Sequence, residues 1–311
     1  MAKVSCRKAF GSSLEMLAEN DCSIFAVATD SRGSAAVDGF AKKFPDRFIE
    51  VGIAEQNAVS LAAGLSLTGK TVFVAGPACF LSSRSYEQIK IDAAYNKTNV
   101  KIIGVSAGVS YGPLGGTHTS LHDIAGFRAF ANLEIFAPAD DVGTRAVTEY
   151  LAKSGLPAYM RIGRGDVHKV YEQDDKTDVH KAKTVRVGSD ITVIAFGETV
   201  WHAKQASDML KQEGISVRVL DMQCLKPADE QAVISAAKET RSILTVEEHS
   251  ICGGLGELVC GITARNFPVP VETAGFPDEE CKTGKSAELF AYYKLDAAGI
   301  AERIRSRVKR K

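Results

Sequence analysis

The chain has 311 residues, of which 45% are hydrophobic and 24% charged, a composition typical of globular proteins and a length sufficient for two domains, each with its own core. Lysine plus arginine and aspartate plus glutamate number 38 each, so no overall field favours nucleic acid or an anionic membrane. The seven cysteines form no C-x-x-C pair and no apolar run reaches membrane-spanning length, which argues against a zinc site, a disulfide framework and a transmembrane protein and favours a reducing cytoplasm.

Short apolar runs in the first half of the chain alternate with segments of helical period. We expect strands at Ser23–Thr29, Phe48–Gly52, Thr71–Ala75, Val100–Ser106, Leu133–Ala137 and Pro157–Ile162. Each run is followed by a turn and then by a segment with helical periodicity, which is the pattern of a parallel sheet covered by helices. The sequence therefore predicts an α/β domain over residues 1–168.

The periodicity is lost in the polar stretch that follows, and we expect residues 169–184 to be a linker. A second α/β domain is predicted over residues 185–311. Its expected strands are Ile191–Phe196, Ser216–Leu220 and Ser242–Val246, and its expected helices are Thr199–Glu213 and Ala228–Thr240. We thus predict two domains, each a mostly parallel sheet with helices on both faces, and an antiparallel edge strand in the second would fit this pattern.

The stretch "VGIAEQNAVSLAAG", residues 51–64, places a carboxylate at the start of a helix that is apolar nearly all round. The order strand, Gly52, Glu55 puts the carboxylate at the carboxyl edge of the sheet, where ligands of such folds bind. The helix N-terminus favours the anion by ~0.3–1 kcal/mol, whereas burial against Ala58 and Val59 favours the uncharged acid. On the residues alone, Glu55 is either a cap of its own helix or a functional acid.

Two longer segments carry a resemblance that covers almost the whole chain. The segment "RFIEVGIAEQNAVSLAAGLSLTGKTVFVAG" resembles the pyrimidine-binding domain of transketolase and its thiamine-diphosphate-dependent relatives, and "EEHSICGGLGELV" is similar to the transketolase C-terminal domain. The resemblance implies that Glu55 hydrogen-bonds the aminopyrimidine of thiamine diphosphate. As a mostly uncharged acid, Glu55 would favour the imino tautomer whose nitrogen takes the thiazolium proton.

The same resemblance assigns further positions around the cofactor. Phe80, in "PACFLSSRSYEQI", falls where a transketolase phenylalanine stacks on the aminopyrimidine, a contact worth ~0.5–1.5 kcal/mol beyond its buried area. Asp30 matches a position that lines the cofactor cleft. His118, in "GGTHTSLHD", matches the catalytic histidine that faces the thiazolium and the substrate, with His122 as the alternative. Plain core packing for Phe80 and a strand-end turn for Asp30 remain the structural alternatives.

A site for the phosphate of a sugar is implied by three matched positions. Arg7, Ser34 and Arg164 occur where transketolases hold that phosphate, and guanidinium groups suit a phosphate dianion. Two positions depart from the family: Ser106 stands where transketolases carry a histidine, and Leu114 where they carry an aspartate that reads a sugar hydroxyl. The loss of that aspartate weakens discrimination, so we expect a modified or branched phosphosugar in place of the usual pentose phosphates.

A motif of the family is missing. Transketolases hold the diphosphate through Mg2+ with a Gly-Asp-Gly segment and a distal asparagine pair, whereas the only Asp-Gly here is Asp38-Gly39, without them. The resemblance therefore implies the C-terminal subunit of a split transketolase that supplies no metal ligand and is inactive alone. We expect two copies of it to pair with two diphosphate-binding subunits that carry the Mg2+ ligands.

Two other functions remain open. The β subunit of a 2-oxo-acid dehydrogenase uses the same glutamate and a similar second domain. The non-enzymatic alternative is a transketolase-like regulatory subunit that has no catalytic activity. The retained Glu55, Phe80 and His118 argue against it.

Overall fold

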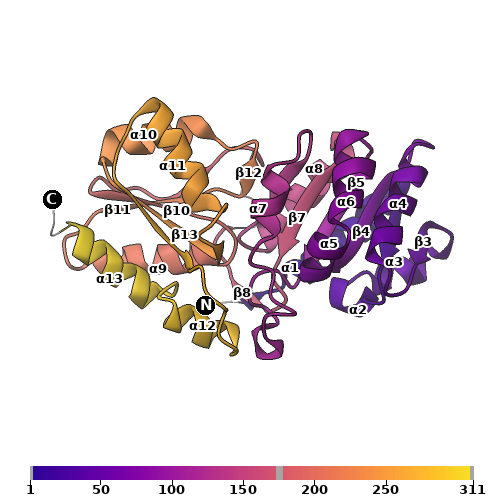
Figure 1. Cartoon of the computed structure of the whole chain (residues 1–311), viewed down its shortest axis with the longest axis horizontal. Coiled ribbons are helices and arrows are strands. Elements are labelled where there is room, and N and C mark those ends of the chain that lie inside the picture. Colours follow the sequence, from indigo (N-terminus) through magenta and orange to yellow (C-terminus); the bar gives the residue numbers. More distant parts are fainter. Residues whose placement is uncertain (1–2, 173–177, 309–311) are drawn as a thin grey trace.

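The computed structural model describes residues 3–172 and 178–308, so residues 173–177 of the predicted linker lie outside the described residues. The chain forms two units side by side, each built on one β-sheet, with the first half of the sequence in one and most of the second half in the other (Figure 1). Helices cover both faces of each sheet. The predicted fold class, α/β with two mostly parallel sheets, is confirmed. None of the described helices is long and apolar enough to cross a bilayer.

The first sheet has seven strands in the order β12-β6-β7-β5-β4-β2-β3. Six of them come from the first half of the chain and run parallel: β2 Ile24–Ala28, β3 Phe48–Glu50, β4 Thr71–Pro77, β5 Val100–Val105, β6 Glu134–Phe136 and β7 Ala158–Ile162. Each corresponds to one of the predicted strands. The central strands β4, β5 and β7 are buried along their whole length, which explains why they appear in the sequence as continuous apolar runs.

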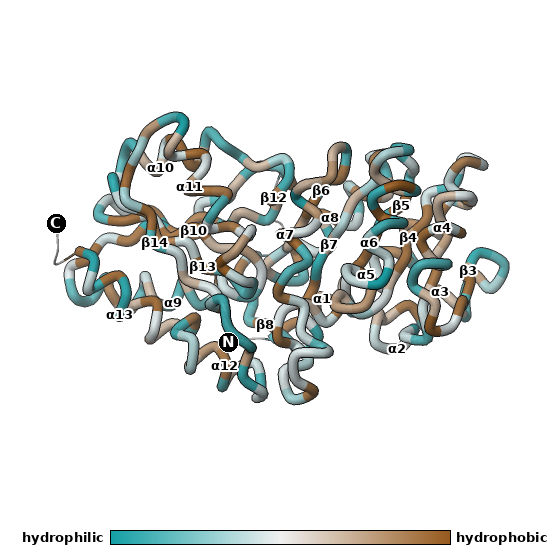
Figure 2. The backbone as a smooth tube through the Cα atoms, viewed as in Figure 1, coloured by the Kyte–Doolittle hydropathy of each residue, from teal (hydrophilic) through white to brown (hydrophobic). Residues whose placement is uncertain are grey.

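Successive residues of β4 point to opposite faces of this sheet. Phe73 packs with α1 and α8, whereas Val72 and Val74 pack with α4, α5 and α7. In Figure 2, brown hydrophobic segments of the backbone tube mark the strands around β4. The helices of this domain are α1 Cys6–Asn20, α2 Arg32–Ala35, α3 Asp38–Lys43, α4 Glu55–Ser66, α5 Ala78–Arg84, α6 Tyr86–Gln88, α7 Asp123–Arg128 and α8 Asp141–Ser154, with a π-helical segment at Ile89–Tyr95 and 3-10 turns at Pro45–Arg47 and Gly112–Leu114.

The second sheet has five strands in the order β14-β13-β10-β11-β9. Its strands are β9 Lys183–Arg186, β10 Ile191–Ala195, β11 Val217–Asp221, β13 Ile243–Ser250 and β14 Val271–Phe276, and its helices are α9 Thr199–Lys211, α10 Glu230–Thr240, α11 Leu255–Asn266, α12 Ser286–Tyr292 and α13 Ala297–Val308. Four strands are parallel, and β9 runs antiparallel at the edge, as the sequence allowed. β9 begins inside the segment expected to be linker. It has four residues, three half-buried and one exposed, so it lacks the apolar run that would indicate a strand in the sequence.

The two domains are joined more closely than the sequence predicts. β12, Cys224–Lys226, belongs to the second half of the chain but pairs antiparallel with β6 in the first sheet. One apolar cluster runs from α4 and the first sheet to β10, α10 and α11 of the second domain. This shared cluster adds to the two clusters that are centred on the first and on the second sheet. A two-stranded ribbon of β1, Lys3–Val4, and β8, Val167–His168, adds a further antiparallel pair.

Candidate active site

The turn between β3 and α4 brings Glu55 to the carboxyl edge of the first sheet. Gly52 adopts a φ of +70°, which a residue with a side chain rarely takes. The Glu50 carboxylate accepts hydrogen bonds from the backbone N–H groups of Gly52, at 3.1 Å, and Asp30, at 2.7 Å, and so ties the turn to the end of β2. Asp30 lies at this same edge with its side chain exposed.

Glu55 is the first residue of α4, and its side chain is only 3% exposed. Arg84, at the end of α5, donates to Glu55 Oε1 at 2.9 Å. The guanidinium of Arg84 also lies over the ring of Phe80, 4.1 Å from its centre. Pairing with a cation makes the burial of the carboxylate tolerable. Both Glu55 and Phe80 therefore contact the charged guanidinium of Arg84, so neither is packed only against apolar side chains.

The shape and contacts of the Arg84 guanidinium indicate which kind of group fits against Glu55 and Phe80. It is flat, carries N–H donors, stacks on an aromatic ring and donates to a buried carboxylate at the same time. The aminopyrimidine ring of thiamine diphosphate is likewise flat and can stack on an aromatic ring, but its ring nitrogen accepts a hydrogen bond, so it would pair with the protonated form of Glu55. A flat ring that replaced the guanidinium of Arg84 would contact both Glu55 and Phe80, and the Arg84 side chain is 46% exposed.

The two candidate histidines occupy different surroundings. The His118 ring packs edge-on against Phe80, with ring centres 5.3 Å apart, and against Tyr111, at 6.0 Å. Its Nδ1 lies 2.9 Å from the Thr117 hydroxyl. His122 instead pairs with Ser83 on α5 through Nε2, at 2.8 Å. His118 is thus the histidine on the wall formed by Phe80, which supports its assignment over His122.

The three residues expected to hold a phosphate lie together. Arg7 donates to the backbone oxygens of Ser34, at 2.7 Å, and Arg164, at 2.9 Å. The Arg164 guanidinium donates to the Ser34 hydroxyl at 3.2 Å and to the hydroxyl of Tyr111. Burial, and then the nearby charge of Arg164, lower the pKa of Arg7 below its usual value. Two cations held close together in this way form a site that an anion would stabilise.

The two positions that depart from the family differ in accessibility. Ser106 is fully buried, has a φ of +56°, and its hydroxyl has no hydrogen-bond partner within the described chain. Leu114 is 56% exposed at the rim of the same loop. The loop runs from β5 through Tyr111 to His118, so one segment carries both the histidine and the tyrosine that contacts Arg164 of the phosphate subsite.

No group of three or more His, Cys, Asp or Glu side chains that could hold a metal ion occurs among residues 3–172 and 178–308.

Two residues of the site were missed in the sequence. Arg84 follows Phe80 by four residues, one helical turn, and this spacing could have placed both side chains on one face of α5. Tyr111 links the two halves of the site: its ring lies 4.8 Å from the Arg164 guanidinium and near His118. No spacing in the sequence indicated Tyr111, because it sits in an irregular loop.

Comparison with known proteins finds matches for both domains. The model of the transketolase pyrimidine-binding domain matches residues 2–169, and that of the transketolase C-terminal domain matches residues 180–300. An apulose-4-phosphate transketolase subunit from Phocaeicola vulgatus is 51% identical over 308 residues, covering 99% of this chain and 98% of that protein. Human transketolase is 34% identical and is covered over 49% of its length.

A solved structure described as a split gene transketolase, inactive beta4 tetramer, aligns with a TM-score of 0.89 at 33% identity over 99% of both chains. These matches do not favour the 2-oxo-acid dehydrogenase or the regulatory alternative. By sequence, by both domains and by fold, the chain belongs to the transketolase family.

Proposed function

We propose that the chain is the C-terminal, pyrimidine-binding subunit of a two-subunit transketolase that transfers a two-carbon ketol group between phosphosugars. The observation that carries the proposal is that the buried Glu55 carboxylate and the Phe80 ring both contact one flat group, the guanidinium of Arg84. Phe80 is connected through His118 and Tyr111 to the cationic pair Arg7 and Arg164. A cofactor subsite and an anion subsite on adjoining walls are what this reaction requires.

Thiamine diphosphate would supply the electron sink for breaking the carbon–carbon bond. In this chain, Glu55 would hold a proton at its carboxyl group and donate it to the pyrimidine ring after Arg84 has moved away. Phe80 would fix the plane of that ring by stacking. His118, on the same wall, would bind and move protons at the substrate hydroxyls, and Asp30 would border the cofactor at the end of β2.

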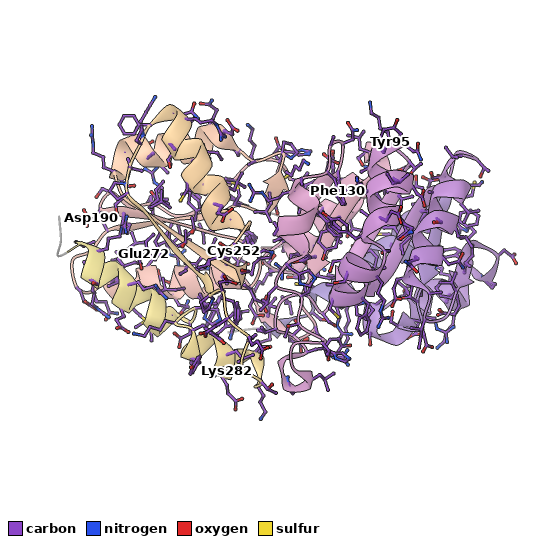
Figure 3. All side chains as sticks on the ribbon, in the orientation of Figure 1. Tyr95, Phe130, Asp190, Cys252, Glu272 and Lys282 are labelled. Atoms are coloured by element: carbon purple, nitrogen blue, oxygen red, sulfur yellow. The ribbon has the colours of Figure 1, made fainter. Side chains whose placement is uncertain are left out.

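The Mg2+ ion and its ligands are assigned to a separate diphosphate-binding subunit. The surface next to Glu55 suits that partner, because the apolar side chain of Ile53 is 73% exposed there. Tyr95, which is 76% exposed at the end of the π-helical segment (Figure 3), precedes β5 and so lies toward the opposite edge of the sheet. Ile53 precedes Glu55 by two residues, so a partner that covers the surface around Ile53 also closes the cofactor site. We propose a heterotetramer containing two copies of each chain, located in the cytoplasm.

The phosphosugar is proposed to be apulose 4-phosphate or a sugar of similar shape. The relative from Phocaeicola vulgatus carries that substrate in its name. Leu114 and Ser106, in place of an aspartate and a histidine, also argue against a site tuned to the common pentose phosphates.

Co-expression with the diphosphate-binding subunit tests the proposal. Turnover of apulose 4-phosphate with an aldose phosphate acceptor is expected only when both chains, thiamine diphosphate and Mg2+ are present. Sedimentation should report two copies of each chain. Ketol transfer by this chain alone, or a reconstituted complex that instead decarboxylates 2-oxo acids, would contradict it.

A further inference from the structure

The loop of residues 106–122, hereafter the site loop, carries Ser106, Tyr111 and His118, but it is packed into the second domain. Val109, near its start, is fully buried and belongs to the apolar cluster formed by the second sheet with α9, α12 and α13. The first domain therefore contributes the loop, and the second domain surrounds Val109 near its start.

Glu248, on β13 of the second domain, binds the backbone of the site loop directly. Its Oε1 accepts the backbone N–H of Val109 at 2.8 Å, and both residues are buried. The approach is close because position 108 is glycine, with a φ of +62°: a Cβ atom there would lie 2.1 Å from the carboxyl carbon of Glu248.

A second contact comes from the start of α12. The Ser286 hydroxyl donates to the carbonyl of Val109 at 3.1 Å, so both backbone polar groups of Val109 are bound by the second domain. At Gly112 the backbone again touches this region, since a Cβ atom would lie 2.3 Å from the carbonyl oxygen of Gly284 and 2.8 Å from Leu289.

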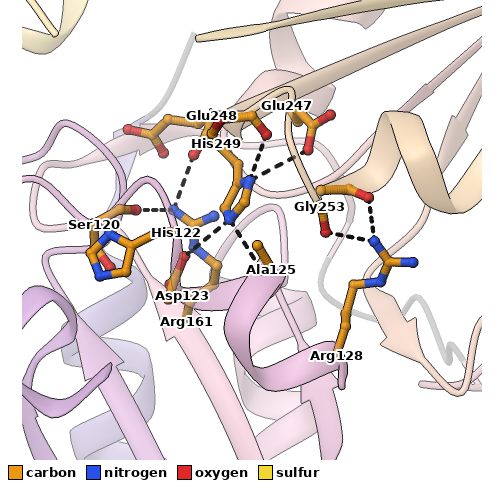
Figure 4. A network of polar contacts seen from close by, with 12 residues as sticks. Ser120, His122, Asp123, Ala125, Arg128, Arg161, Glu247, Glu248, His249 and Gly253 are labelled. Carbon is orange, nitrogen blue, oxygen red and sulfur yellow. Dashed lines mark hydrogen bonds and ion pairs between the residues drawn. The ribbon is translucent and has the colours of Figure 1, made fainter. Parts of the chain in front are cut away.

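The far end of the site loop is held as well. Ser250, at the end of β13, donates its backbone N–H to the carbonyl of Leu121 at 2.9 Å. Arg161 on β7 donates to the carbonyl oxygens of Glu248, at 3.1 Å, and Ser120, at 3.5 Å, and thereby joins strand, loop and second domain (Figure 4).

We infer that the second domain is the positioning element of the active site, and that Glu248 and Ser286 are positioning residues that hold the site loop so that Tyr111 meets Arg164 and His118 meets Phe80. The site loop contains four glycines, at positions 108, 112, 115 and 116, so without these contacts its backbone has many conformations open to it. The inference extends the proposed function by assigning a role in substrate binding to the second domain.

Hydrogen exchange measured by mass spectrometry on the full chain tests the inference without turnover. Glu248→Ala leaves the Val109 N–H unpaired, so amides of residues 106–122 should exchange roughly tenfold faster. Glu248→Gln keeps a carbonyl oxygen as acceptor and should exchange as the wild type does. Ser235→Ala is the matched control, because its hydroxyl bonds to Glu239 within α10.

The reconstituted complex provides the second readout. Glu248→Ala and Ser286→Ala should each raise the KM for the phosphosugar by roughly tenfold, while the Kd for thiamine diphosphate, measured directly by fluorescence, should stay within about twofold, because Glu55 and Phe80 lie outside the site loop. If Glu248→Ala does not fold, Ser286→Ala decides.

Unchanged exchange and KM in the folded variants, or a Glu248→Gln variant as damaged as Glu248→Ala, would overturn the inference. A complex without ketol transfer would refute the proposed function but leave the exchange result valid.

Discussion

Replacing Arg164 by methionine is expected to weaken binding of the phosphosugar without slowing its conversion. The guanidinium of Arg164 is half-buried, donates to Ser34 and stacks beside Tyr111, whereas Arg7 is held by the backbone carbonyl of residue 164, which the substitution keeps. One of two cations is therefore lost while the other stays in place.

The magnitude follows from the loss of one charge-assisted contact, which is worth ~1.5–3 kcal/mol. The KM for the phosphosugar should rise roughly 10–100-fold. The kcat should change by less than about twofold, because the phosphate is remote from the reacting carbon and is bound alike in the ground and transition states.

Steady-state kinetics of the reconstituted complex with phosphorylated and unphosphorylated sugar decide the question. The variant should lose efficiency only with the phosphorylated sugar, and sulfate should inhibit it less than it inhibits the wild type. Arg32→Met, which removes an exposed arginine paired with Asp38, is the control and should leave both substrates unaffected. An equal loss for both sugars, or an unchanged KM for the phosphosugar, would refute a phosphate subsite at Arg164.

Three further predictions concern other parts of the molecule. Arg84→Met removes a partly exposed ion pair that the cofactor has to displace, so thiamine diphosphate should bind up to about fivefold more tightly in a fluorescence titration; weaker binding would show that Arg84 helps to hold it. Burial, and then the charge of Glu198, raise the pKa of Glu248 to about 8, so the wild-type free energy of unfolding should fall as pH rises from about 4.5 to about 8, and Glu248→Gln should reduce this fall in urea titrations. Leu114→Asp combined with Ser106→His should shift kcat/KM toward the common pentose phosphates, and an unchanged preference would mean that these positions do not set specificity.

The sequence predicted the elements that depend on local pattern. The parallel strands β4, β5 and β7 are buried on both faces, so each is a continuous apolar run whatever its neighbours are. β12 has only three residues, and no periodicity tells which sheet such a segment joins. Its pairing with β6 depends on how the two domains pack, which local sequence does not specify.

The same limit applies to the site. Glu55 follows a strand and Gly52, so its place at the sheet edge could be predicted from the chain order. Glu55 and its partner Arg84 are 29 positions apart in the chain, and Val109 and Glu248 are 139 positions apart. Pairs so distant in the sequence are not identified by local charge or hydrophobic pattern. The resemblance indicated only that Ser106 and Leu114 depart from the family, whereas the structure shows that Ser106 is buried and Leu114 is exposed.

The role of Glu55 is tested most directly by the rate at which the thiazolium proton of thiamine diphosphate exchanges with solvent in the reconstituted complex, compared between wild type and Glu55→Gln. If Glu55 acts by donating a proton to the pyrimidine ring, the exchange rate and kcat should both fall at least ~100-fold, while the KM for the phosphosugar stays unchanged. Wild-type exchange and full turnover in Glu55→Gln, with the cofactor bound, would contradict the role assigned to the buried carboxylate.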